Sequence, residues 1–220
     1  MKRVIITGAS GMIGGLVLQK CLSRPDVSQV TSIVRRSSGI VHSKLIEIIH
    51  ADFLDYSSIE NHFKNQDICF FCIGVYTGQV SKEEFVKITV GYTKAFAETL
   101  KRFSPNVTFC FLSGDGADQS EKSRVLFARE KGIAENILLG LKFGATYIFR
   151  PGYIYPVTPR QEPNFSYKVF RVLYKYLFQF VLPSIGITSE KLVAAMEDIG
   201  MNGGTQVIYK NTDLRKYKVG

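Results

Sequence analysis

The run Thr7-Gly8-Ala9-Ser10-Gly11-Met12-Ile13-Gly14 follows the β-branched apolar segment 4–6 and opens a stretch with helical spacing of apolar residues. Three glycines with this spacing, between a strand and a helix, are typical of a turn that binds a dinucleotide. The helix N-terminus adds free N–H groups and the positive end of its dipole. A glycine-rich turn without a ligand is the alternative. The predicted cofactor contacts are Gly8, Ala9, Ser10, Gly11, Met12, Ile13 and Gly14.

Strand-like runs alternate with helix-length amphipathic stretches along the whole chain. We predict strands at 3–7, 29–34, 45–50, 67–73, 107–113 and 145–150. We predict helices at 12–23, 57–64, 81–102, 122–141, 164–181 and 189–199. This alternation predicts an α/β fold, a doubly wound parallel sheet of the Rossmann type. A chain of 220 residues suits one domain, so we expect 1–220 to fold together, with 153–220 contributing a small C-terminal cap that covers the substrate.

Composition and charge limit the possible partners. Hydrophobic residues make up 45% of the chain and charged residues 21%, as in an ordinary soluble protein. No apolar stretch has the length of a spanning helix, and 1–3 lead into a strand without a signal-peptide layout, so we expect a cytoplasmic protein. The net charge of +9 suits an anionic partner, although a solvated basic surface explains it as well. We expect no nucleic acid and leave peripheral membrane contact open.

The cysteines do not indicate a disulfide framework or a metal site. Cys21, Cys69, Cys72 and Cys110 all lie in apolar segments, which favours reduced thiols in the core. Cys69 and Cys72 have the spacing of a redox or metal pair, but residues three apart in a strand point to opposite faces. The three histidines show no metal-ligand spacing, so we predict no metal site.

The residues after the second strand indicate which dinucleotide is bound. Arg35 and Arg36 stand where proteins selective for NAD usually place an acid against the ribose. A guanidinium there can pair with a 2′-phosphate, which favours NADP(H) over NAD(H), whereas an ordinary basic loop is the alternative. Asp52 and Phe53 follow the third strand as further cofactor contacts, although Asp52 is equally suited to capping a turn. Gly74, after the fourth strand, leaves room for the nicotinamide ribose.

Several motifs together resemble one superfamily. They are the opening turn, Arg35-Arg36, Phe71-Cys72-Ile73-Gly74, Leu112-Ser113 through Gly116-Ala117-Asp118, Lys131-Gly132 and Phe149-Arg150-Pro151-Gly152. The chain resembles the short-chain dehydrogenase/reductases in their atypical branch, and within it the Tat-interacting oxidoreductase type. The resemblance covers most of the chain and adds Pro151 to the predicted cofactor contacts.

The same resemblance implies a catalytic frame that this chain only partly has. In the superfamily a tyrosine four residues before a lysine is the general acid, the lysine holds the nicotinamide ribose, and a serine positions the carbonyl. Lys131 and Ser113 carry over, but the tyrosine position is Phe127, which cannot donate a proton. Relatives usually have a second serine where this chain has Gly114.

Two classes of function therefore remain open. The first is a weak NADP(H)-dependent carbonyl reductase that takes its proton from water or another side chain, at a cost of about a hundred- to ten-thousandfold in rate. The second is a non-catalytic dinucleotide-binding regulator or redox sensor that acts through a protein partner. The aromatic segment 165–181 is expected to cover the substrate cleft, pair with another subunit or rest on a membrane, unless it is a buried helix.

Overall fold

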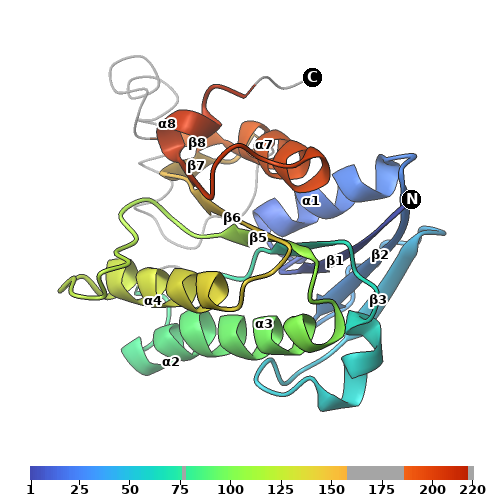
Figure 1. Ribbon diagram of the computed structural model, residues 1–220, viewed down its shortest axis with the longest axis horizontal. Coiled ribbons are helices and arrows are strands. Elements are labelled where there is room, and N and C mark those ends of the chain that lie inside the picture. The colour runs from blue at the N-terminus through green and yellow to red at the C-terminus, as the bar shows by residue number, and fades with distance from the viewer. Residues whose placement is uncertain (76–77, 158–185, 218–220) are drawn as a thin grey trace.

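Seven parallel strands form the central sheet (Figure 1). The computed structural model describes residues 1–75, 78–157 and 186–217. The strand order across the sheet is β3-β2-β1-β4-β5-β6-β9. The strands are β1 (Lys2–Thr7), β2 (Val27–Val34), β3 (Leu45–Ile49), β4 (Ile68–Phe71), β5 (Thr108–Leu112), β6 (Ala145–Arg150) and β9 (Ile208–Lys210). The order reverses between β1 and β4, and open α/β sheets bind ligands at the carboxyl ends of such strands.

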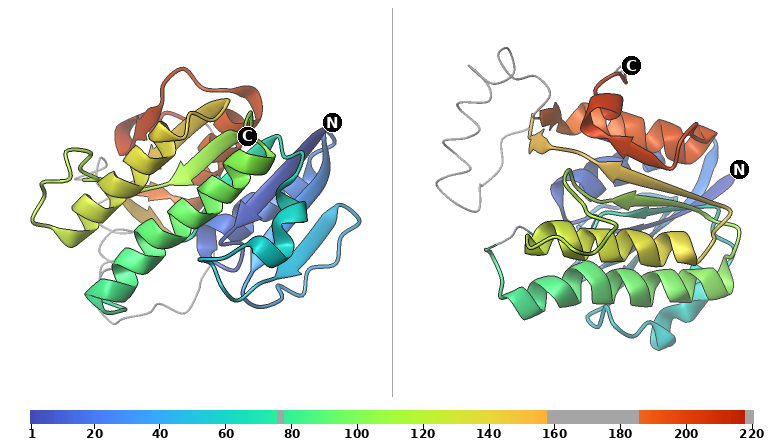
Figure 2. Two further views of the ribbon diagram at one scale, coloured as in Figure 1. Left: turned by 60° about the horizontal axis from the view of Figure 1, so that its bottom comes forward. Right: turned by 60° about the vertical axis from the view of Figure 1, so that its left-hand side comes forward.

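Helices cover both faces of the sheet, as the three views show (Figures 1 and 2). Helices α1 (Met12–Ser23) and α7 (Ser189–Asn202) lie on one face, and α3 (Tyr92–Phe103) and α4 (Leu126–Gly140) lie on the other. The remaining elements are α2 (Lys82–Val86), the π-helical turn η2 (Lys87–Gly91), the 3-10 helix η1 (Ser57–Phe63), α8 (Asn211–Leu214) and the parallel pair β7 (Tyr153–Tyr155) and β8 (Gly186–Thr188).

The core has two apolar clusters, one on each face of the sheet. In β1, Val4 and Ile6 belong to the cluster under α1 and α7, whereas Ile5 belongs to the cluster under α3 and α4. Side chains of a strand alternate between faces, so a strand covered on both sides has an unbroken apolar sequence. The cluster under α3 is aromatic: Phe96 packs against Phe71 at 5.3 Å between ring centroids.

The doubly wound parallel sheet predicted from the sequence is confirmed, and all six predicted strands are present, 145–150 with the predicted ends and the other five with ends shifted by one or two residues. The elements after residue 150 were mostly missed, because β7, β8, β9 and α8 have only three or four residues each. The predicted helix 57–64 is a 3-10 helix. The predicted helix 164–181 lies outside the described residues.

The predicted helix 122–141 begins only at Leu126, so its first turn was wrong. The reason is a turn held by Asp118, whose carboxylate accepts the N–H groups of Ser120 at 2.9 Å and Ser123 at 2.8 Å. Such side-chain bonds give the backbone an alternative to helix. The hydroxyl of Ser120 donates to the same carboxylate at 2.7 Å, and this bond together with the N–H groups holds the pKa of Asp118 below its usual value.

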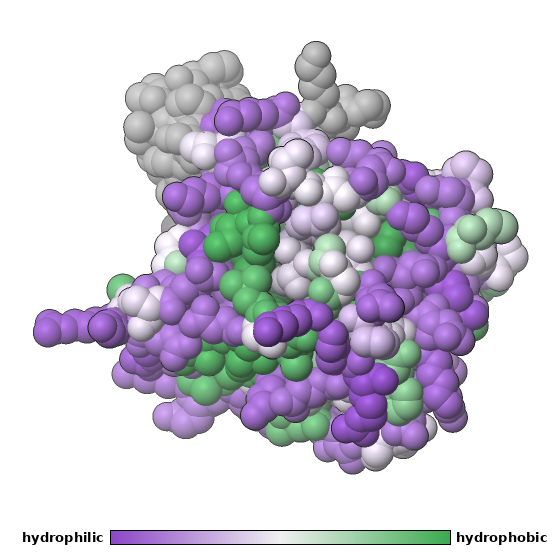
Figure 3. Space-filling model, viewed as in Figure 1, coloured by the Kyte–Doolittle hydropathy of each residue, from purple (hydrophilic) through white to green (hydrophobic). Residues whose placement is uncertain are grey.

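The surface is mostly polar, and the cysteines are unpaired. Hydrophilic side chains cover most of the face in Figure 3, with an apolar stripe left of its centre and smaller apolar patches below it and to its right. Among the described residues, no helix is long and apolar enough to span a membrane, and no group of side chains could hold a metal ion. All four cysteines are free thiols. Cys69 and Cys72 face opposite sides of the sheet, as predicted.

Candidate dinucleotide-binding site

The turn between β1 and α1 has the shape that the glycine spacing predicts. Gly8 has a φ of +82°, a conformation that glycine adopts without strain. Its carbonyl accepts the N–H of Gly11 at 2.9 Å, which closes the turn. Gly11 is the N-cap of α1 and has no side chain to cap it. The first-turn N–H groups of the helix are therefore available to an anion.

Two glycines of the turn are required by close packing, because their neighbours leave no room for a side chain. A Cβ at Gly14 would lie 2.2 Å from the Gly8 carbonyl oxygen. A Cβ at Gly8 would lie 2.6 Å from the backbone carbonyl of Cys72, at the end of β4. Ala9 and Ile13 are buried beneath the turn, Met12 is half-buried, and Ser10 is exposed. The turn thus packs against the end of β4 at Gly8, and Ser10 and Gly11 at the helix N-terminus are exposed.

Arg35 and Arg36 directly follow β2 and are exposed. Within the described part of the chain, neither guanidinium makes a hydrogen bond or an ion pair. The two serines that follow the arginines contact a carboxylate of β3. Glu47 accepts a hydrogen bond from the hydroxyl of Ser37 at 2.6 Å and from that of Ser38 at 2.5 Å. Partial burial alone would raise the pKa of Glu47, but these hydrogen bonds outweigh it and lower the pKa. The acid is thus satisfied by serines, and the arginines remain available.

The other predicted adenosine and ribose contacts lie at the same sheet edge. Asp52 is exposed, and its carboxylate accepts the N–H of Leu54 at 2.9 Å, so it caps a turn. Phe53 is buried in the aromatic cluster, with its ring 5.5 Å from that of Tyr92. A Cβ at Gly74 would meet no atom within 4 Å, so the fold itself does not require glycine there.

Ser113 takes part in a buried polar network that the sequence did not indicate. Its hydroxyl donates to Glu135 at 2.5 Å. Glu135 is 0% exposed and also accepts from both Nε and Nη2 of Arg150, and from Gln119 at 3.0 Å. A buried carboxylate needs such partners, and a guanidinium satisfies it with two parallel bonds. The network therefore joins the ends of β5 and β6 to α4.

Lys131, one helical turn before Glu135, is 6% exposed. Its ammonium donates to the carbonyl of Leu112 at 3.1 Å and lies 5.0 Å from the centroid of the Phe111 ring. Burial lowers the pKa of Lys131 to about 8, although the carboxylate of Glu135 opposes this shift. The amine is thus held at the end of β5, with a pKa near the working pH of most proteins.

The ring of Phe127 fills the place of a side chain at Gly114. A Cβ at Gly114 would lie 2.5 Å from the ring tip, atom Cζ of Phe127. Phe85 lies behind this ring, at 6.4 Å between centroids. The missing tyrosine hydroxyl and the missing second serine are therefore linked by packing, because the phenyl ring occupies the space that a serine would need.

Pro151 is buried after β6, and its carbonyl accepts the N–H of Asp115 at 2.8 Å. Gly8, Gly74, Ser113, Lys131 and Pro151 all come from the carboxyl ends of β1, β4, β5 and β6 or from the helix beside them. Parallel strands bring these ends to one edge. The site residues that sequence reasoning missed are Glu135, Arg150 and Gln119. The spacing of Lys131 and Glu135, four residues apart on one helix, was the available signal.

A doubly wound parallel sheet with a glycine turn at its switch point defines a dinucleotide-binding protein of the Rossmann type. The comparisons with known proteins agree. A family model described as NAD(P)H-binding matches residues 8–141. The rat protein HTATIP2 is 30% identical over 164 residues, which are 73% of this chain and 65% of the rat protein, just under two thirds of its length. Protein FMP52, mitochondrial, of Meyerozyma guilliermondii is 24% identical over 97% of this chain and 94% of its own.

Solved structures share the fold. A short chain dehydrogenase family protein from Francisella tularensis has a TM-score of 0.66 at 14% identity, over 97% of this chain and 98% of its own. The Bordetella bronchiseptica enzyme WbmH, solved with NAD⁺, has a TM-score of 0.69 at 14% identity, over 96% and 75%. The chain belongs to the NAD(P)H-binding family. It shares its fold with the short chain dehydrogenase family protein, as the resemblance of its motifs predicted.

Proposed function

We propose that this protein binds NADP(H) and acts as a dinucleotide-dependent regulator or sensor, in which occupancy of the site matters more than turnover. The glycine turn would hold the diphosphate at the N-terminus of α1. Arg35 and Arg36 would pair with the 2′-phosphate, because both are exposed and the neighbouring Glu47 is satisfied by serines. Lys131 would face the nicotinamide ribose, and the bound cofactor would supply hydride chemistry.

The observation that favours a regulator is the packing of Phe127 on Gly114. The tyrosine position and the second serine position lack a hydroxyl, and the hydroxyl of Ser113 donates a hydrogen bond to Glu135. Among the frame positions, no free hydroxyl is therefore left to a carbonyl. A regulator of this kind requires a partner protein that binds differently to the cofactor-bound and cofactor-free forms.

A slow carbonyl reductase is the second candidate, and Lys131 favours it. A buried amine with a pKa of about 8 can exchange protons near neutral pH. Hydride transfer with a poorly positioned proton donor would be slow rather than absent.

We also keep a cytoplasmic location as a prediction, although several fungal relatives are named mitochondrial proteins. Cell fractionation would distinguish a cytoplasmic from a mitochondrial location.

A calorimetric titration tests the cofactor. Each charge-assisted bond to the 2′-phosphate contributes about 1.5–3 kcal/mol, so NADPH should bind at least about tenfold more tightly than NADH. Arg35→Ala and Arg36→Ala should weaken NADPH binding and leave NADH binding nearly unchanged. Arg102→Ala is the matched control, because Arg102 is exposed near the end of α3, at the opposite edge of the sheet. Equal affinities for the two cofactors would contradict the proposal.

A further inference from the structure

The loop between β2 and β3 combines two exposed arginines with a serine that contacts a carboxylate. Residues 35–44 form no helix or strand, and most of them are exposed. Arg35 and Arg36 stand three and two residues before Ser38. Kinases that select basic substrates read arginines at these positions through acidic pockets, and charge patterns of this kind set their specificity. The recognition residues Arg35 and Arg36 are thus exposed, whereas Ser38 is half-buried, and its hydroxyl becomes accessible when its contact with Glu47 opens.

We propose that Ser38 is a phosphorylation site whose modification removes the preference of this protein for NADP(H) over NAD(H). The proposal rests on the proposed role of Arg35 and Arg36 in binding the 2′-phosphate. A nucleoside triphosphate supplies the phosphoryl group. The bond between its γ-phosphorus and the bridging oxygen breaks, a bond from phosphorus to Oγ of Ser38 forms, the hydroxyl proton is lost and a nucleoside diphosphate leaves.

The contacts of Ser38 show what the modification would change. Its hydroxyl donates to Oε2 of Glu47 at 2.5 Å, and its N–H donates to the same carboxylate at 3.0 and 3.1 Å. A phosphoserine has no hydroxyl proton to donate and carries about 1.5 to 2 negative charges at pH 7. Repulsion from Glu47 would therefore open this contact and move the phosphate away from β3.

The arginines are the cations that the displaced phosphate would meet first. They stand three and two residues before Ser38, and neither guanidinium has a hydrogen-bond or ion-pair partner among the described residues. Guanidinium groups bind phosphate with paired, charge-assisted hydrogen bonds. A phosphate on Ser38 would take the position that the 2′-phosphate of NADP(H) needs. NADH lacks that phosphate, so its binding should change little.

The test uses the full chain, a basophilic protein kinase and ATP. Intact-mass and peptide mass spectrometry should show one phosphate on Ser38. Ser38→Ala should abolish it, and Ser37→Ala, the matched control, should retain it. Titration of the modified protein should then show NADPH affinity lowered at least about tenfold and NADH affinity changed by less than about threefold.

The outcomes separate this inference from the cofactor proposal. If the unmodified chain binds NADPH and NADH equally, the cofactor proposal fails and this switch fails with it. If the unmodified chain prefers NADPH but Ser38 is not modified, or the modification falls on Ser37, only the site is wrong. A chain phosphorylated on Ser38 that keeps its preference for NADPH would overturn the switch. Ser38→Asp gives an independent reading, with a smaller loss of NADPH affinity in the same direction.

Discussion

At the scale of single residues, the decisive contact lies between Phe127 and Gly114. In the superfamily frame, a tyrosine at 127 would supply the proton and a serine at 114 would stand beside the substrate carbonyl. Here the ring tip lies where that serine would begin. Adding a hydroxyl to this ring places it against the backbone of Gly114, rather than at the end of an open pocket. Neither change can therefore be reversed unless the ring at position 127 moves away from position 114.

We predict that Phe127→Tyr alone does not create a carbonyl reductase. A positioned general acid is worth about a hundredfold or more, whereas we expect the variant to stay within about threefold of the wild type. NADPH oxidation with a panel of aldehydes and ketones measures this. The control is a cofactor titration, in which Phe127→Tyr should bind as the wild type does, while Lys131→Ala should bind more weakly. A large gain in activity with Phe127→Tyr would support the slow reductase instead.

At the scale of elements, α4 carries the site and is held by a close approach of the preceding loop. A Cβ at Gly132 would lie 1.8 Å from the carbonyl oxygen of Asp118. The loop also brings Gln119 to Glu135 and donates the N–H of Asp118 to the carbonyl of Ala128 at 2.9 Å. Gly132 therefore serves packing between helix and loop, which the Lys131-Gly132 motif alone could not reveal.

Two glycines of α4 form a matched pair. Gly132→Ala should lower the free energy of unfolding by about 1–3 kcal/mol, because backbone atoms of the loop must move. Gly140→Ala should raise it by up to about 1 kcal/mol, because a Cβ there meets no atom within 4 Å and alanine favours helix. Urea unfolding measures both. Equal changes in the two variants would contradict the close contact with Asp118.

The sequence predicted those parts of the fold and site that depend on local pattern. The strand–turn–helix at 7–14 could be derived, because glycine positions and periodicity there describe one short unit. The network of Glu135 with Arg150 could not, because its members come from α4 and β6 and meet only in the folded chain. The late start of α4 was missed for a similar reason, since Asp118 captures N–H groups that helical periodicity alone assigns to the helix.

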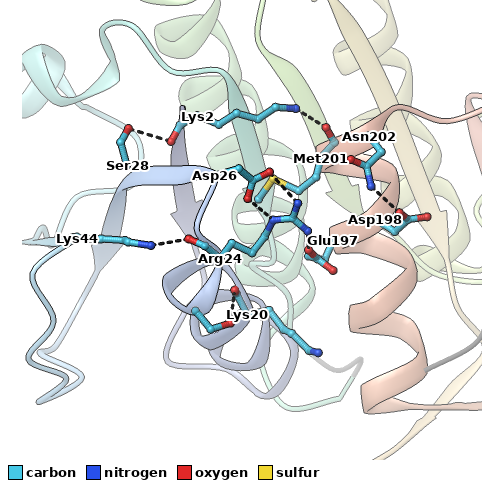
Figure 4. A network of polar contacts seen from close by, with 11 residues as sticks. Lys2, Lys20, Arg24, Asp26, Ser28, Lys44, Glu197, Asp198, Met201 and Asn202 are labelled. Carbon is cyan, nitrogen blue, oxygen red and sulfur yellow. Dashed lines mark hydrogen bonds and ion pairs between the residues drawn. The ribbon is translucent and has the colours of Figure 1, made fainter. Parts of the chain in front are cut away.

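At the scale of the whole molecule, a polar network joins the two ends of the described chain (Figure 4). Arg24, at the C-terminus of α1, binds Asp26 with Nε and Nη2, each at 2.7 Å, and pairs with Glu197 of α7. The ammonium of Lys2 donates to the carbonyl of Met201. Helix α7, far along the chain, is thereby attached to the first βα unit, which carries the glycine turn.

We predict that Arg24→Ala weakens this attachment and lowers the free energy of unfolding by about 1–2 kcal/mol. The expected loss is modest because the arginine is partly solvated. The hydrogen bonds from Arg24 hold the pKa of Asp26 below its ordinary value of 3.8. That part of the stability is present above the ordinary pKa and is lost as pH falls through the lowered one. The difference between variant and wild type should therefore shrink below about pH 4. Lys20→Ala, an exposed change on the same helix, should stay within about 0.5 kcal/mol of the wild type in urea unfolding. Equal losses in the two variants, or a difference that does not depend on pH, would show that α7 is held by its apolar face alone.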